Sequence, residues 1–292
     1  SVAVLLLGLG VLQLHALPSL QPSPYTKALC ETLPGPCPLD GWDAHPGRLF
    51  STWLDPNLLG ALFVLAASVL LVVPAPHRHP FRLLLVGAGL LLLVALLLTK
   101  SRTALGALAV VSVASGLLYR TWRRLVPLAT AGALGLLLVP ELSRRLSSLF
   151  QSDPTVSLRL HSWSQAIEHV LRFPWFGSGY NAYGFEQLAL GNIQNLQIHS
   201  RAGADSSLLT FLATTGVWGT GLLLVFMGGL LWVLFARSSP SIGRPIGSRV
   251  QVRTAGASPH PWITRAAFLA RLGLLTHAQF AHSFVYVHLA VP

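Results

Sequence analysis

The chain contains seven long apolar segments, and each approaches the ~20 residues that a helix needs to cross a bilayer. Leucine, valine, alanine and glycine predominate in these segments. A helix that is apolar on all faces suits a lipid environment. The segments cover residues 1–17, 56–73, 81–98, 103–119, 125–139, 206–235 and 266–291. The sequence therefore predicts an all-α, polytopic transmembrane protein with about seven transmembrane helices.

The composition supports this prediction. Only 10% of the 292 residues are charged, whereas a soluble domain has about 25%, which argues against an ordinary soluble enzyme. The formal net charge is +11, but the basic residues are not interleaved with aromatic ones as in a nucleic-acid-binding face. We expect a lipid bilayer and no nucleic acid as partner. The chain opens at Ser1 inside an apolar run, so we expect a fragment that forms a single transmembrane domain and lacks N-terminal helices.

The distribution of charge predicts the orientation. Eleven of the 20 basic residues and none of the nine acids lie in one set of connections, near residues 75–82, 120–124 and 236–271. The positive-inside rule makes that side cytoplasmic. We therefore expect a multi-pass protein of the bacterial cytoplasmic (inner) membrane whose functional side is periplasmic. The predicted loops are a first outer loop at 18–56, a long periplasmic loop at 140–205 and a cytoplasmic loop at 236–265.

Two features stand out in the predicted outer loops. Residues 158–173 have the pattern of an amphipathic helix, and we expect it at the membrane surface, the alternative being a plain loop helix. Cys30 and Cys37 are the only cysteines, and an oxidising periplasm permits a disulfide between them. No histidine and cysteine cluster has the spacing of a metal site, so we expect no metal and no cofactor.

Two outer arginines are candidates for binding an anion. Arg102 lies in a short polar turn between two apolar segments. It is either a snorkelling anchor or a phosphate ligand, since a guanidinium matches phosphate oxygens. Arg159 lies near the start of the amphipathic helix; by itself it is an ordinary surface arginine, but with Arg102 it completes a clamp for a diphosphate.

Glycines and two potential bases complete the set of candidates. Gly177 and Gly179 form a turn after the amphipathic helix and permit close approach to a ligand, while Gly216 and Gly219 interrupt the sixth apolar segment, as close helix packing requires. Its position predicts that Asp205 is a helix N-cap or first-turn residue. Asp205 or His199 is also a candidate general base.

Several segments together resemble the O-antigen ligase and polymerase family of bacterial membrane glycosyltransferases. The resemblance covers roughly residues 50–290, and its motifs occur in the family's order. They are Thr52–Gly60, Thr99–Ala104, Arg159 with Trp163 and Ala166, Pro174–Tyr180, Asp205–Ser206 followed nine residues later by Gly216–Gly219, and His282–Phe284.

The resemblance implies a helical, membrane-embedded glycosyltransferase with a periplasmic loop over its active site. The donor would be a glycan linked to undecaprenyl diphosphate, and the acceptor a glycan or lipid-linked sugar. Arg102 and Arg159 match the arginines that bind the donor diphosphate. The implied transfer is inverting and metal-independent, and it serves lipopolysaccharide or polysaccharide biosynthesis in the cell envelope.

One position departs from the family's pattern. Asp205 stands where the ligases have a catalytic histidine. The base is then Asp205, His199 or neither, and the change favours polymerisation, or transfer to another acceptor, over a lipopolysaccharide ligase. Two other classes stay open: a transporter or flippase for an amphipathic anion, whose pathway the arginines would line, and a structural membrane subunit.

Overall fold

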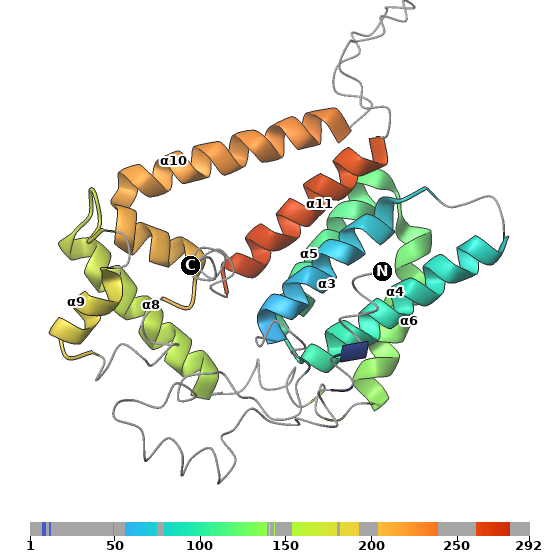
Figure 1. The fold of residues 1–292 in the computed structure, drawn as a ribbon, viewed down its shortest axis with the longest axis horizontal. Coiled ribbons are helices and arrows are strands. Elements are labelled where there is room, and N and C mark those ends of the chain that lie inside the picture. The colour runs from blue at the N-terminus through green and yellow to red at the C-terminus, as the bar shows by residue number, and fades with distance from the viewer. Residues whose placement is uncertain are drawn as a thin grey trace, which may run out of the picture.

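A computed structural model shows an all-helical chain over the residues that it describes, with no strand among them (Figure 1). These residues are 8, 9, 12, 49, 56–74, 79–138, 140, 143, 154–179, 182–192, 204–238 and 261–280. The described helices are α3 (Pro56–Val72), α4 (His79–Thr99), α5 (Arg102–Tyr119), α6 (Trp122–Leu138), α8 (Pro154–Arg172), α9 (Tyr183–Ala189), α10 (Ser207–Ser238) and α11 (Pro261–Ala278).

Local sequence explains several helix boundaries. Helices α3, α8 and α11 begin with proline, whose fixed φ suits the first helical position and whose missing N–H has no intrahelical partner there anyway. Helix α5 ends at Arg120, which adopts φ 55° and donates its backbone N–H to the carbonyl of Gly116. A left-handed residue of this kind is a common helix stop.

Within the described residues, three helices are long and apolar enough to cross a membrane. They are the segment 81–99 of α4, all of α5 and all of α10, while α3 is apolar but shorter. An all-helical chain with candidate membrane spans is thus confirmed, and the number of seven stays a prediction. The first predicted segment lies almost wholly outside the described residues. The seventh was placed too late, since α11 begins at Pro261 rather than at Ala266; proline opens the helix upstream of the apolar run.

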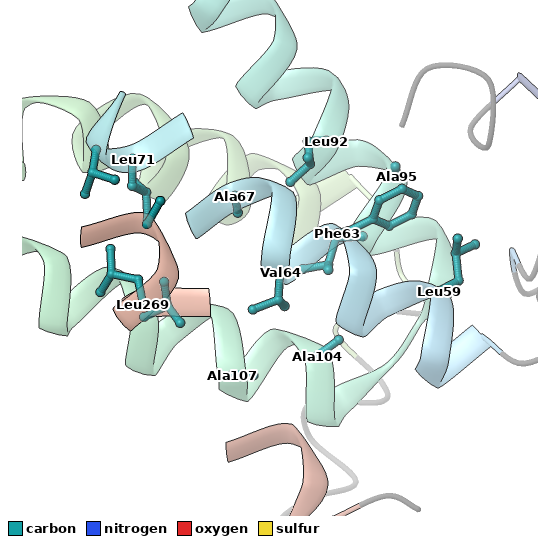
Figure 2. Packing of buried hydrophobic residues seen from close by; sticks show 14 of the residues in the cluster. Leu59, Phe63, Val64, Ala67, Leu71, Leu92, Ala95, Ala104, Ala107 and Leu269 are labelled. Carbon is teal, nitrogen blue, oxygen red and sulfur yellow. The ribbon is translucent and has the colours of Figure 1, made fainter. Parts of the chain in front are cut away.

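The main core lies among α3, α4, α5 and α11. Val64 of α3, Ala107 of α5 and Leu269 of α11 are all buried there (Figure 2). Small residues bring the helices close together: a Cβ on Gly60 of α3 would lie 2.7 Å from the Cβ of Ala104. Lipid tails are as apolar as these side chains, so close van der Waals packing, rather than hydrophobic burial, stabilises such contacts. We call α3, α4, α5, α6 and α11 the bundle.

A second, smaller group of helices packs beside one end of the bundle. It comprises α8, α9 and the first nine residues of α10, and we call it the outer layer (Figure 1). Its core is small, with Ala166, Tyr183, Ala204 and Ala213 buried together. Helix α8 confirms the predicted helix at 158–173, with bounds of 154–172. Its apolar Ile167 and Leu171 are exposed, so its position at the membrane surface stays a prediction.

Helix α10 is broken, so that its first part lies in the outer layer while its second part contacts α11 of the bundle, where Phe235 packs against Phe268. Gly216 has φ 65° and ψ −168° inside the helix, a backbone region that essentially only glycine adopts. The 22 residues after the break rise about 33 Å, which is enough to cross a bilayer core. The sixth segment, predicted as a single long span, is therefore a short outer piece followed by a spanning piece.

Candidate functional site

The turn that carries Arg102 is tightly fixed by hydrogen bonds. Lys100 adopts φ 50°, and its N–H donates to the carbonyl of Leu97 at 3.0 Å. The next N–H, of Ser101, donates to Oγ1 of Thr99 at 3.3 Å. Helix α5 then begins at Arg102, which is half-buried. The main chain of this arginine is thus held in one position. We call this end of the bundle the Arg102 end.

Ser101 is the N-cap of α5. It has extended φ and ψ, and its hydroxyl accepts a hydrogen bond from the N–H of Ala104 at 3.3 Å. A cap of this kind stabilises a helix by about 1 kcal/mol. The cap therefore fixes the first turn of α5, where Arg102 lies.

A chain of buried polar side chains connects α5 to α3 and α11. The hydroxyl of Ser101 donates to Oδ1 of Asn57 at 2.8 Å and lies 3.0 Å from Oγ1 of Thr103. Oγ1 of Thr103 lies 3.1 Å from Nε2 of His277, near the end of α11. Each hydroxyl has one hydrogen. Since Ser101 donates to Asn57, its contact with Thr103 is one in which Thr103 donates, and the donor between Thr103 and His277 depends on the tautomer of the ring.

Arg159 lies at the same end of the bundle. Its charge acts on the ring of His277, which also hydrogen-bonds the main chain of Asn57. One turn further along α8, the ring of Trp163 lies 6.1 Å from that of Phe280, just beyond α11. The structure thus brings Arg102 and Arg159, from helices far apart in the sequence, to the same side chain: His277 bonds the neighbour of one and adjoins the other.

Asp205 lies in the outer layer, just before α10. It is half-buried with φ 44°, and the capping hydrogen bond is made by Ser206, whose Oγ accepts from the N–H of Leu209 at 3.4 Å. The prediction of Asp205 as N-cap was therefore wrong by one residue. Burial, and then the carboxylate of Asp205, raise the pKa of the Tyr183 hydroxyl in α9. Asp205 thus lies close to the interface of α8 and α9.

Several predicted site residues lie outside the described part of the chain. They are His199, Cys30 and Cys37, together with the first four residues of the first motif and the late histidine of the resemblance, His282. Their predictions stay as stated, and the structure bears on the remaining candidates.

The turn after α8 joins the break in α10 through main-chain hydrogen bonds. We call this contact the joint. The N–H groups of Val217 and Trp218 donate to the carbonyls of Pro174 and Trp175 at 2.8 and 3.4 Å. In the other direction, the N–H groups of Ser178 and Gly179 donate to the carbonyls of Ala213 and Thr214 at 3.0 and 2.9 Å. Backbone groups that the helix break leaves without intrahelical partners are thereby satisfied.

Two of the predicted glycines make this joint possible. A Cβ on Gly216 would lie 2.4 Å from the carbonyl carbon of Trp175, and one on Gly177 would lie 2.4 Å from that of Thr214. Both are positions where main chain meets main chain. Gly179 has φ 100° with open space around it, and a Cβ on Gly219 would meet only Thr215 of its own helix.

The outer layer also buries polar atoms that lack hydrogen-bond partners. Both ring nitrogens of His169 and Nε2 of Gln187 are unpaired, although each side chain is only 1% exposed. The His169 ring packs edge-on against Tyr183, with centroids 5.1 Å apart. Burial lowers the pKa of His169. Unpaired buried groups of this kind are costly.

The buried polar chain was missed from the sequence. Asn57, Thr103 and His277 were not candidates, because each is an isolated polar residue in an apolar segment. One signal was present for two of them: Asn57 and Thr103 lie within a turn of segment ends on the predicted outer side. His277 lies in the middle of the seventh predicted segment and gives no such signal.

A cavity of about 240 Å³ lies at the opposite end of the bundle. Apolar residues of α3 and α4 line it, together with Arg82, Arg123 and Arg124. One nitrogen of Arg124, Nη1, donates to the carbonyls of Leu71 and Val73 at 2.9 and 2.6 Å. None of the predicted site residues lines this cavity.

Comparison with known proteins gives one family. The family model described as O-antigen ligase matches residues 87–224. No curated protein matches the chain. The matched range includes Arg102, Arg159, Asp205 and the joint, and it supports the family that the motifs predicted.

Proposed function

Because the family model described as O-antigen ligase matches residues 87–224, we propose that this membrane protein is a glycosyltransferase of the O-antigen ligase and polymerase family. It transfers a glycan from an undecaprenyl-diphosphate-linked donor to a sugar hydroxyl. The reaction takes place at the periplasmic face of the inner membrane. The acceptor is another glycan or a lipid-linked sugar.

One observation supports this function most strongly. Arg102 in α5 and Arg159 in α8 both adjoin the buried polar chain at the Arg102 end of the bundle. Two guanidinium groups at one membrane-proximal end suit a lipid-linked diphosphate, whose charge lies where the lipid leaves the bilayer. The spanning helices beside them provide a surface for the lipid chain.

The chemistry follows from this placement. The acceptor hydroxyl attacks the anomeric carbon, and the bond from that carbon to the diphosphate oxygen breaks. Undecaprenyl diphosphate leaves with the electron pair, and a single displacement inverts the anomeric centre. The two arginines stabilise the negative charge that develops on the leaving group, an electrostatic role that needs no metal ion.

The hydroxyl proton is taken up by a base, for which we propose Asp205. Its carboxylate lies in the outer layer, close enough to Tyr183 to affect the phenol, and an ionised carboxylate can accept a proton. His199 is the other candidate, and it lies on the predicted loop that leads to Asp205.

The arginine roles are tested by Arg102→Ala and Arg159→Ala in the full-length protein in membranes, with a radiolabelled undecaprenyl-diphosphate oligosaccharide. We expect each to lower transfer by about 100-fold or more, as loss of a group that stabilises transition-state charge does. The control is Arg172→Ala, on the same helix as Arg159, because Arg172 is exposed and pairs with Glu168. Full activity in both test variants would refute the diphosphate clamp.

The product of the same assay distinguishes the activities. A ladder of products that Asp205→Asn abolishes indicates a polymerase with Asp205 as base, and a single transferred band indicates a ligase. A ladder that survives in Asp205→Asn but not in His199→Gln assigns the base to His199. If the wild type makes no product and label crosses the membrane instead, the protein is a transporter and our proposal is wrong.

A further inference from the structure

His277 is a buried histidine with no role in the proposed reaction. It lies one residue before the end of α11 and is 1% exposed. At this depth it cannot meet an acceptor sugar directly. Its neighbours are nevertheless the residues on either side of the proposed diphosphate site.

On one side His277 holds the first turn of α5. Nε2 lies 3.1 Å from Oγ1 of Thr103, and Thr103 in turn lies 3.0 Å from the Oγ of Ser101. Ser101 and Thr103 are the residues immediately before and after Arg102. Both chain neighbours of Arg102 are therefore tied to α11 through one imidazole ring.

The Ser101 hydroxyl has no unused donor or acceptor in this series of hydrogen-bonded side chains. The Ser101 hydroxyl donates to Asn57 and accepts from the N–H of Ala104 and from Thr103, which uses its full hydrogen-bonding capacity. Thr103 completes this chain through its hydrogen bond to Nε2 of His277, in which the donor depends on the tautomer of the ring. Only a side chain that can form a hydrogen bond at this point completes the chain.

On the other side His277 adjoins α8. Arg159 and Trp163 are four residues apart and share one face of that helix. Trp163 contacts Phe280, three residues beyond His277, and the charge of Arg159 reaches the His277 ring. The end of α11 is therefore packed between the helix that carries Arg102 and the helix that carries Arg159.

We propose that His277 is a positioning residue that sets the separation of Arg102 and Arg159, and thereby the fit of the site to a diphosphate. The proposal rests on the proposed function, because it presumes that the two arginines bind the donor. Thr103 is the contact through which His277 acts on α5.

The test separates donor binding from turnover. In Thr103→Val the shape is kept and the hydroxyl is lost, whereas Thr103→Ser keeps the hydroxyl. We expect Thr103→Val and His277→Ala to raise the KM for the radiolabelled undecaprenyl-diphosphate oligosaccharide by about tenfold, the equivalent of one hydrogen bond. The kcat should change little. Thr103→Ser, and His277→Gln with its amide near the place of Nε2, should restore most of the KM.

A matched control lies next to His277. Thr276 bonds only the carbonyl of Leu272 in its own helix, at 2.9 Å, so Thr276→Val should leave KM and kcat unchanged. A purely structural role for His277 would lower the yield of active protein and leave the KM of the active fraction unchanged, without rescue by glutamine. That result, or wild-type kinetics in Thr103→Val, would overturn the proposal.

A binding measurement separates this inference from the proposed function. Binding of undecaprenyl diphosphate alone to the purified full-length protein requires no transfer. Weaker binding in Thr103→Val, with recovery in Thr103→Ser, supports the positioning role even if no glycan is transferred. Tight, unchanged binding in both variants, together with normal transfer by the wild type, would refute the positioning role and leave the proposed function standing.

Discussion

The bundle and the outer layer are held together by different kinds of contact. In the bundle, apolar side chains of α3, α5 and α11 interlock over a long core (Figure 2). In the outer layer few side chains are buried, two of its buried residues have unpaired polar atoms, and the main connection to α10 is made by backbone groups. The bundle is thus specified mainly by side-chain shape, and the outer layer mainly by main-chain geometry.

The largest expected effect comes from breaking the joint. In Gly216→Ala, the Cβ meets the main chain of Trp175 and the residue must adopt a glycine-only conformation. We expect a cost of about 3 kcal/mol or more, faster proteolysis within residues 154–192, and loss of glycan transfer. The bundle should keep its thermal stability.

The matched control for this change is Gly221→Ala in the same helix, where a Cβ would have open space. It should be neutral or slightly stabilising, because alanine favours helix over glycine. If Gly216→Ala and Gly221→Ala gave the same protease sensitivity, backbone contact would not be what holds the outer layer.

A substitution at the end of the bundle opposite Arg102 should lower the stability of the bundle and leave donor binding unchanged. Arg124→Met removes the guanidinium that satisfies carbonyls at the end of α3. Hydrogen bonds from a charged group contribute about 1.5–3 kcal/mol, so we expect a loss of roughly that size in the free energy of unfolding in detergent. The KM for the donor should not change. Arg123→Met, at the exposed neighbour, is the control; a shift in KM in Arg124→Met alone would mean that the two ends are coupled.

The smallest expected effect concerns His169 in the outer layer. Burial lowers its pKa in the folded state below the usual value of about 6.5. The unfolded state therefore binds more protons, and this stability is complete above pH ~6.5 and is lost as the pH falls below it. Hydrogen exchange of residues 154–192 should show the outer layer opening more readily at pH 5 than at pH 7.

The variant His169→Phe tests whether the ring nitrogens of His169 cause this pH dependence. The ring keeps its contacts with Tyr183 and loses two unpaired buried nitrogens, so we expect a gain of about 1 kcal/mol in stability and a weaker pH dependence. A loss of stability, or an unchanged pH dependence, would show that those nitrogens have partners in solution.

The two regions also differ in how well the sequence predicts them. For the bundle, apolar runs predicted α3, α4 and α5 to within two residues at either end, because lipid demands long apolar helices whatever their partners. Hydropathy does not report hydrogen bonds between segments, so the chain from Asn57 to His277 could not be predicted.

The outer layer was predicted less completely. Amphipathic periodicity found α8, but the short α9 has too few residues to show a period. Gly177 was predicted to permit close approach to a ligand and Gly216 to permit close helix packing, and nothing in the sequence shows that each lies against the other's segment. Resemblance to a family supplied the proposed roles of Arg102, Arg159 and Asp205, which no local pattern specifies.

The joint has a consequence for how this surface can change during evolution. Its hydrogen bonds are made by main-chain atoms, so they place almost no demand on the side chains that project from it. Trp175 and Phe176, whose carbonyl and N–H atoms lie against Gly216, point outward and are 61% and 76% exposed. Substitutions there can alter what the outer surface contacts while the attachment of the layer to α10 stays the same. The main-chain attachment can therefore stay the same while the exposed side chains above it are replaced.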